Sequence, residues 1–157
     1  MALESTHLAP GRNYAPRVVT EGVLDGDAVV YELFPLQTVA FDGRTSTIQS
    51  IPFPVFDSDA YGEGVLSVMV KSHSILLSGS ELRVRIQNAI QSEDDPAAVF
   101  AENGAFATIG ASTPGKRVLT VAWPVVGPSC RLCLEWSQVT VLPASVTMAV
   151  WLTLRRA

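Results

Sequence analysis

The chain has 157 residues, of which 48% are hydrophobic and only 17% are charged, and its formal net charge is −4. This length is typical of one domain with a real core, since roughly 68–70% of the surface of the unfolded chain can be buried. The negative charge excludes a general attraction for nucleic acid or an anionic membrane, and no apolar run approaches the ~20 residues that span a bilayer.

Residues 1–16 (MALESTHLAPGRNYAP) predict an extended N-terminal arm. Two prolines and a glycine interrupt any regular pattern, and a segment with so few apolar side chains cannot hold itself in place. We expect the arm either to be disordered in the isolated protein or to bind a neighbouring subunit through Leu3, Leu8 and Tyr14. It lacks the basic and apolar regions of a secretory signal, so we expect synthesis in a cytoplasm without export.

Glycine and proline turns divide residues 17–157 into short β-prone runs, which predict a single domain. In the first half of the chain the expected strands are residues 17–24, 28–34, 37–41, 44–50 and 65–77, the last of these being either one long strand or two strands broken near Ser72. The Asp42-Gly43 pair lies between two of these runs and is a strong hairpin signal. We therefore expect a hairpin there, with Val39 and Phe41 facing inward.

Residues 51–64 contain two prolines, two glycines and three aromatic side chains. They predict a long connection that packs Phe53 and Phe56 at the edge of the core. Loop carboxylates can hold Ca²⁺ through their oxygens, and Asp57 and Asp59 are the first ligands we would expect. The acidic loops do not follow the spacing of a calcium-binding loop, so we interpret them as solvated turns and expect no metal or cofactor.

Residues 81–91 (ELRVRIQNAIQ) alternate more cleanly than any other segment. Leu82, Val84 and Ile86 point one way, and the arginines and the glutamine between and after them point the other way. A period of two predicts a strand with one face on a core and one face in water. We expect this segment to be a central strand of an antiparallel sheet.

The remaining expected strands are residues 105–109, 117–123, 130–142 and 145–154, the last two forming a pair joined at Pro143. Trp151 falls on the outward face of the last strand, and Trp123 ends the strand before the final pair. An exposed aromatic side chain often marks a contact. No segment of ten or more residues has a helical period, so the sequence predicts an all-β fold, an antiparallel β-sandwich or jelly roll of about nine or ten strands.

The two cysteines, Cys130 and Cys133, stand in the run SCRLCLEW. The alternation of Leu132, Leu134 and Trp136 places this run on a strand, where an odd spacing puts the two thiols on opposite faces. Three residues of strand also separate their Cα atoms by about 10 Å, too far for a disulfide. We expect two reduced thiols rather than a redox pair or a zinc site.

No catalytic constellation is visible. The chain has only two histidines, His7 in the arm and His73 in an expected strand, and nucleophilic catalysis needs a base beside the nucleophile. It contains no glycine-rich phosphate loop and no metalloprotease or hydrolase motif. We therefore expect a protein that is not an enzyme, with His73 as an ordinary strand residue.

A carbohydrate-binding module would present aromatic side chains on a sheet face or in loops. Tyr61, Trp123 and Trp151 are available for this, whereas Trp136 shares a face with two leucines and is expected in the core. A carbohydrate-binding β-sandwich module, with or without calcium assistance, is thus the alternative function.

The second half of the chain carries a series of patterned runs: ELRVRIQ followed by a polar turn, then FATIG, KRVLTV, RLCLEW and SVTMAVWLTL. Over residues 81–156 this series resembles small β-sandwich structural proteins of tailed bacteriophages. The resemblance implies a virion component made in the host cytoplasm, either a capsid decoration or cement protein or a subunit associated with the head or tail. It implies a homo-oligomer acting through repeated contacts with its own copies and other capsid or tail proteins, without turnover.

Overall fold

The computed structural model describes residues 7–8, 17–21, 28–50, 52–54, 61–92, 94–124 and 128–156. Their regular structure consists of strands, and no helix among them could span a membrane. The strands are β1 (His7–Leu8), β2 (Arg17–Glu21), β3 (Ala28–Phe41), β4 (Thr45–Gln49), β5 (Phe53–Pro54), β6 (Tyr61–His73), β7 (Glu81–Ala89), β8 (Ala101–Gly110), β9 (Arg117–Pro124), β10 (Ser129–Ser137) and β11 (Ala144–Arg156).

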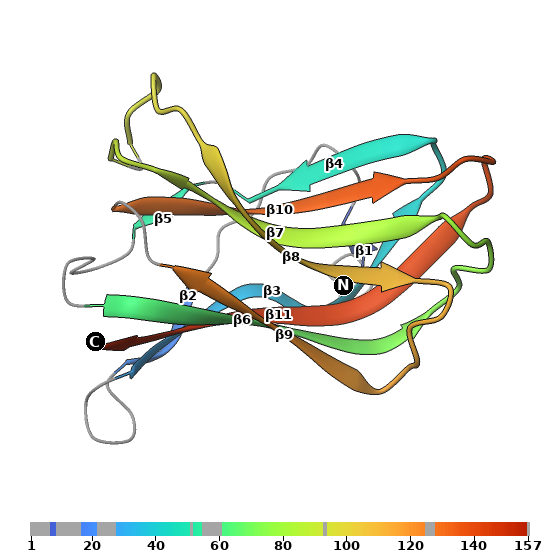
Figure 1. Cartoon of the computed structure of the whole chain (residues 1–157), viewed down its shortest axis with the longest axis horizontal. Coiled ribbons are helices and arrows are strands. Elements are labelled where there is room, and N and C mark those ends of the chain that lie inside the picture. Colours follow the sequence, from blue (N-terminus) through green and yellow to red (C-terminus); the bar gives the residue numbers. More distant parts are fainter. Residues whose placement is uncertain are drawn as a thin grey trace.

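The strands form two sheets that lie one on the other (Figure 1). The β11 sheet has the order β1-β3-β11-β6-β9, with β2 also paired to β3. The β10 sheet has the order β4-β10-β7-β8, with β5 also paired to β10. The eight strands β3, β4 and β6 to β11 have the connectivity of a jelly roll, which confirms the all-β sandwich predicted from the sequence.

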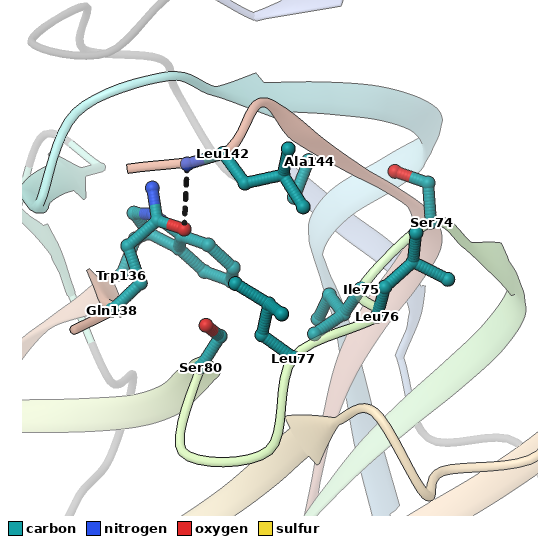
Figure 2. A pocket seen from close by; sticks show the side chains of 9 residues that line it. All are labelled: Ser74, Ile75, Leu76, Leu77, Ser80, Trp136, Gln138, Leu142 and Ala144. Carbon is teal, nitrogen blue, oxygen red and sulfur yellow. Dashed lines mark hydrogen bonds between the residues drawn. The ribbon is translucent and has the colours of Figure 1, made fainter. Parts of the chain in front are cut away.

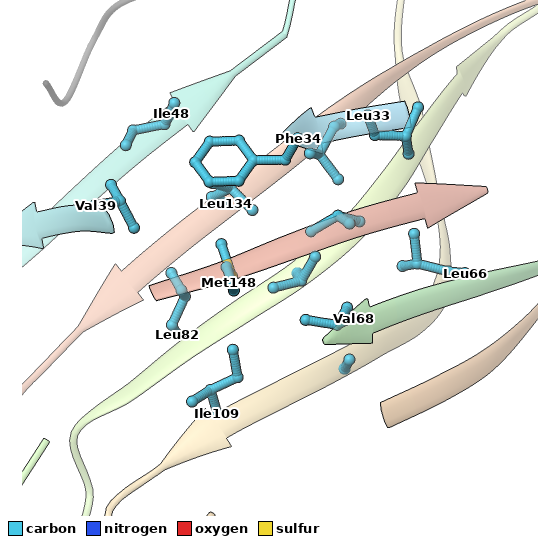
Figure 3. Close-up of a cluster of buried hydrophobic side chains, with 14 of the residues drawn as sticks. Leu33, Phe34, Val39, Ile48, Leu66, Val68, Leu82, Ile109, Leu134 and Met148 are labelled. Atoms are coloured by element: carbon cyan, nitrogen blue, oxygen red, sulfur yellow. The ribbon is translucent and has the colours of Figure 1, made fainter. Parts of the chain in front are cut away.

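Alternation along the strands builds the core between the two sheets. In β7 the side chains of Leu82, Val84 and Ile86 are all 0% exposed, as the period of two predicted, and β7 lies between β10 and β8. Figure 3 shows side chains of both sheets, among them Met148 and Leu134, in the space between the layers. Each fully buried leucine or isoleucine contributes about 1.5–3 kcal/mol relative to leaving it in water.

Strand β3 runs through Pro35, where the sequence had suggested a break. The register between β3 and β11 shifts on either side of Val150, so β3 carries extra residues at this point. Proline is tolerated in a sheet at such a bulge because it leaves no ladder hydrogen bond unmade. The bulge also lets two consecutive side chains, Leu33 and Phe34, reach the core.

Two connections differ from the sequence prediction. The turn at Asp42 and Gly43 does not close a hairpin, because β3 belongs to the β11 sheet and β4 to the β10 sheet. Likewise β10 and β11 are not paired with each other, and the loop through Pro143 crosses between layers. Both are corrections of strand pairing alone, since Val39 and Phe41 do face the core as expected.

The N-terminal arm is described only at His7 and Leu8. These two residues form β1, which pairs in parallel with Thr38 and Val39 of the chain's own β3. Leu3 and Tyr14, the other two residues expected to bind a neighbouring subunit, lie outside the described residues. The role of the arm in contacts between subunits stays a prediction.

Candidate binding face on the β10 sheet

Polar and charged side chains form adjacent rows on the outer face of the β10 sheet. The antiparallel register places Arg85 of β7 opposite Cys133 of β10 and Phe106 of β8. Two residues along the strand, Arg83 lies opposite Glu135. We call this surface the arginine face and define it by Glu81, Arg83, Arg85, Gln87, Phe100, Phe106, Arg131 and Glu135.

Each of the three guanidinium groups is held by a partner within the face. Arg85 forms an ion pair with Glu135, and Arg83 Nε donates a hydrogen bond to Glu81 Oε1 at 2.7 Å. Arg131 Nε donates to Gln87 Oε1, also at 2.7 Å. These contacts fix the planes of the three groups on a rigid pair of strands.

Two phenylalanine rings lie under the guanidinium groups. The central carbon of the Arg83 guanidinium is 4.8 Å from the ring centroid of Phe106, and that of Arg131 is 4.3 Å from the ring centroid of Phe100. Both distances are within the range of cation–π attraction. Phe106 remains 38% exposed, so part of this ring is open to a ligand.

The ion pair between Arg85 and Glu135 shifts the ionisation of the carboxyl group. The hydrogen bond from Arg85 lowers the pKa of Glu135 below its ordinary value of 4.5. A carboxyl group whose pKa is depressed by folding stabilises the folded state above that ordinary value, and the contribution is lost as the pH falls through the folded pKa.

We expect the stability of the protein to fall more steeply between about pH 5 and pH 3 than that of Glu135→Gln, because only the wild type loses this ionised partner of Arg85. Urea midpoints measured across that pH range would show the difference. Asp94→Asn removes an exposed carboxyl group elsewhere and is the matched control. Parallel pH profiles for the wild type and Glu135→Gln would contradict the assignment.

The two cysteines are free and lie on opposite faces of β10, as the sequence predicted. Cys130 is part of the core, and burial raises the pKa of its thiol far above the ordinary value. Cys133 lies on the outer side, where its thiol donates to Glu135 Oε1 at 3.6 Å. Burial raises the pKa of Cys133 to about 11, so neither thiol is a good nucleophile at neutral pH.

His73 has a structural role at the end of β6. Its Nδ1 accepts a hydrogen bond from the backbone N–H of Ile75 at 3.1 Å, so the ring proton is on Nε2, which donates to the carbonyl oxygen of Thr113 at 2.5 Å. The hydroxyl of the neighbouring Ser74 accepts a hydrogen bond from the backbone N–H of Ser145. The His73 and Ser74 side chains each hydrogen-bond to the backbone of another segment and so hold the ends of β6 and its neighbours in place. They do not form a nucleophile–base pair.

A small cavity lies at one end of the sandwich, between the β6–β7 and β10–β11 loops (Figure 2). Ile75, Leu77, Trp136 and Leu142 are among its lining residues, and its volume is about 10 Å³. That volume holds about one water molecule. This cavity is too small for a substrate or a sugar ring.

The residues singled out in the sequence do not form the arginine face. Trp151 is half-buried on β11, between Glu32 and Ser67 of the flanking strands, and Trp123 lies on β9 with its backbone opposite Gly64. Asp57 and Asp59 lie outside the described residues. Within the part of the chain that the structure describes, no group of three His, Cys, Asp or Glu side chains could hold a metal ion.

Sequence reasoning recognised the outward direction of Arg83 and Arg85 but not the face that they build with Arg131 and Glu135. The available signal was the same alternation in two runs, ELRVRIQ and SCRLCLEW. Neither run indicates that it pairs with the other. The face exists only because β7 and β10 are neighbours in the sheet.

No protein-family model and no curated protein matches this chain. Among solved structures, it is similar to one from work on the promiscuous specificity of carbohydrate-binding modules of the β-sandwich superfamily, with a TM-score of 0.40 and 8% identity. The match covers 89% of this chain and 54% of the length of the other chain. A second is CsCBM6-3 from Clostridium stercorarium in complex with cellobiose, with a TM-score of 0.31, 11% identity, and coverage of 94% and 88%. Likeness at this level assigns no ligand to the chain.

Proposed function

We propose that this protein is a non-catalytic carbohydrate-binding β-sandwich module whose ligand lies across the arginine face. The observation that carries the proposal is the ordered set of planar groups on one sheet face. Sugars offer neighbouring hydroxyls that planar guanidinium, carboxylate and carboxamide groups can bind in pairs. They also offer apolar C–H surfaces that pack on an aromatic ring such as Phe106.

The arginine face is preorganised for such a ligand. Arg83 and Arg131 are each held by a hydrogen bond and a ring contact at the distances given above. Side chains already fixed by their neighbours lose little conformational freedom on binding, so more of the contact energy appears as affinity. An open face of this kind also suits a chain of sugars better than the small cavity at the end of the sandwich.

The test is a glycan array probed with the wild type and with Arg83→Gln/Phe106→Ala. We expect the double variant to bind the strongest glycan of the array at least about tenfold more weakly, because it loses one polar and one apolar contact. Arg117→Gln/Val118→Ala is the matched control, since both residues are exposed on β9 in the other sheet. A silent array, or equal losses in the two variants, would contradict the proposal.

A second candidate function is that of an assembly subunit in a phage-like virion, bound to its own copies and to other particle proteins. The observation in its favour is the apolar exposure of the two loops beside the cavity, where Leu76 is 78% and Val139 is 74% exposed. Exposed apolar patches on soluble domains often mark protein contacts.

For this candidate we expect a native mass of several chains, reduced to one chain by Leu76→Asp/Val139→Asp. Analytical ultracentrifugation over a range of protein concentrations measures it. Thr140→Asp is the control, because it adds a charge to the same loop without removing an apolar contact. A wild type that sediments as a single chain at every concentration would contradict this second candidate.

A further inference from the structure

Arg131 differs from the other two arginines of the face in the charge of its partner. Arg83 is paired with the carboxylate of Glu81, and Arg85 with that of Glu135. Arg131 is instead held by the neutral carboxamide of Gln87 and by the ring of Phe100. Among the described residues no carboxylate lies within ion-pair distance of Arg131.

The geometry leaves part of the Arg131 guanidinium available. Its Nε donates a hydrogen bond to Gln87 Oε1. The two terminal nitrogens can each donate a hydrogen bond to one oxygen of a carboxylate, which gives a bidentate pair. Arg131 is only half-buried, so a ligand on the face can approach these two nitrogens. Partial burial lowers the pKa of the Arg131 guanidinium and the nearby Cys133 acts in the opposite direction, but the group remains charged at neutral pH.

The charge of the whole face favours an anion of low charge density. The eight residues that define the arginine face carry three guanidinium groups and two carboxylates, and Glu102 of β8 pairs with Gln87 at the border of the face, on a protein whose net charge is −4. A densely charged polyanion such as a nucleic acid would be repelled by the remainder of the protein. A sugar chain with isolated carboxylates matches a single unpaired guanidinium.

We infer that the arginine face takes an acidic glycan and that Arg131 binds the carboxylate of a uronic or sialic acid unit. The inference rests on the proposed carbohydrate-binding function and names its ligand class. Gln87 and Phe100 position the guanidinium, and the terminal nitrogens of Arg131 donate to the two carboxylate oxygens. The Phe106 end of the face contacts neighbouring sugar rings.

The experiment uses a panel of oligosaccharides in matched pairs, each uronic or sialic acid glycan beside the same glycan with its carboxyl group methyl-esterified. We expect the wild type to bind the free acid at least about tenfold more tightly than the ester, with the difference shrinking at high salt. Arg131→Gln should bind both members of a pair as weakly as the wild type binds the ester, and Arg131→Lys should keep part of the preference. Arg117→Gln, an exposed arginine on β9, is the matched control and should keep all of it.

The outcomes separate this inference from the function on which it rests. Equal binding of acid and ester by the wild type would overturn the carboxylate site and leave sugar binding standing. A silent panel, neutral glycans included, would overturn both. Equal affinity for dextran sulfate, poly-glutamate and the acidic glycans would show attraction to any polyanion, which also overturns the assignment. The wild-type comparison does not depend on whether the variants fold.

Discussion

Replacing Trp136 by alanine is expected to lower the free energy of unfolding by about 3–5 kcal/mol, the range for large aromatic side chains in a core. The Trp136 side chain is 2% exposed, and its ring stacks on Phe41 with centroids 5.2 Å apart. Its indole Nε1 donates to the carbonyl oxygen of Gly43 at 3.1 Å. The substitution removes the stacking, leaves a cavity and breaks the tie between β10 and the turn after β3. Urea denaturation measures the loss.

Two further variants serve as comparisons for Trp136→Ala. Trp136→Phe keeps a ring against Phe41 and loses the hydrogen bond to Gly43, so we expect a loss of about 1 kcal/mol from that bond, with any additional loss reflecting the smaller ring. Trp151→Ala removes the same side chain from a half-buried position on the outer face of β11, and its cost should be smaller. A loss for Trp136→Ala no larger than that for Trp151→Ala would mean that Trp136 does not lie in the core.

Replacing Gln138 by alanine is expected to cost about 1–3 kcal/mol, because two partly buried hydrogen bonds are lost at once. Gln138 is 8% exposed, its Nε2 donates to Gly43 O at 2.7 Å, and its Oε1 accepts from the backbone N–H of Leu142 at 3.3 Å (Figure 2). The side chain therefore joins the turn after β3 to the loop between β10 and β11. Thermal unfolding and urea denaturation both report this loss.

The neighbouring Val139 supplies the control for Gln138. Its side chain is mostly exposed, so Val139→Ala should change the free energy of unfolding by less than about 0.5 kcal/mol. Gln138→Glu keeps the size of the side chain but turns a carboxylate toward the Gly43 carbonyl, and it should be at least as destabilising as alanine. If Gln138→Ala were as mild as Val139→Ala, the linking role of Gln138 would be wrong.

The sequence was sufficient for the fold class because a period of two is a local property. Leu82, Val84 and Ile86 alternate with polar residues, and the physics of burial then fixes which face meets the core. Strand pairing is not local in this way. The Asp42-Gly43 turn reverses the chain equally well within one sheet or between two, and nothing near it distinguishes the jelly-roll crossing from a hairpin.

The candidate site was harder to predict for the same reason. Arg83 and Arg131 are 48 positions apart in sequence, and they share a face only through the register of β7 with β10. Sequence reasoning also favoured tryptophans as ligand platforms, whereas the rings on the arginine face belong to Phe100 and Phe106. A ring beneath a guanidinium has no signature in a single sequence, because its partner comes from another strand.

Sugars are proposed to bind to the outer face of the β10 sheet. The most direct measurement is an NMR titration of ¹⁵N-labelled protein with the strongest-binding oligosaccharide of the array, following the backbone amides. The account predicts saturable shifts centred on β7, β8 and β10 around Arg83, Arg131 and Phe106. Shifts confined to the β11 sheet or to the loops beside the cavity, or no shifts at all, would contradict it.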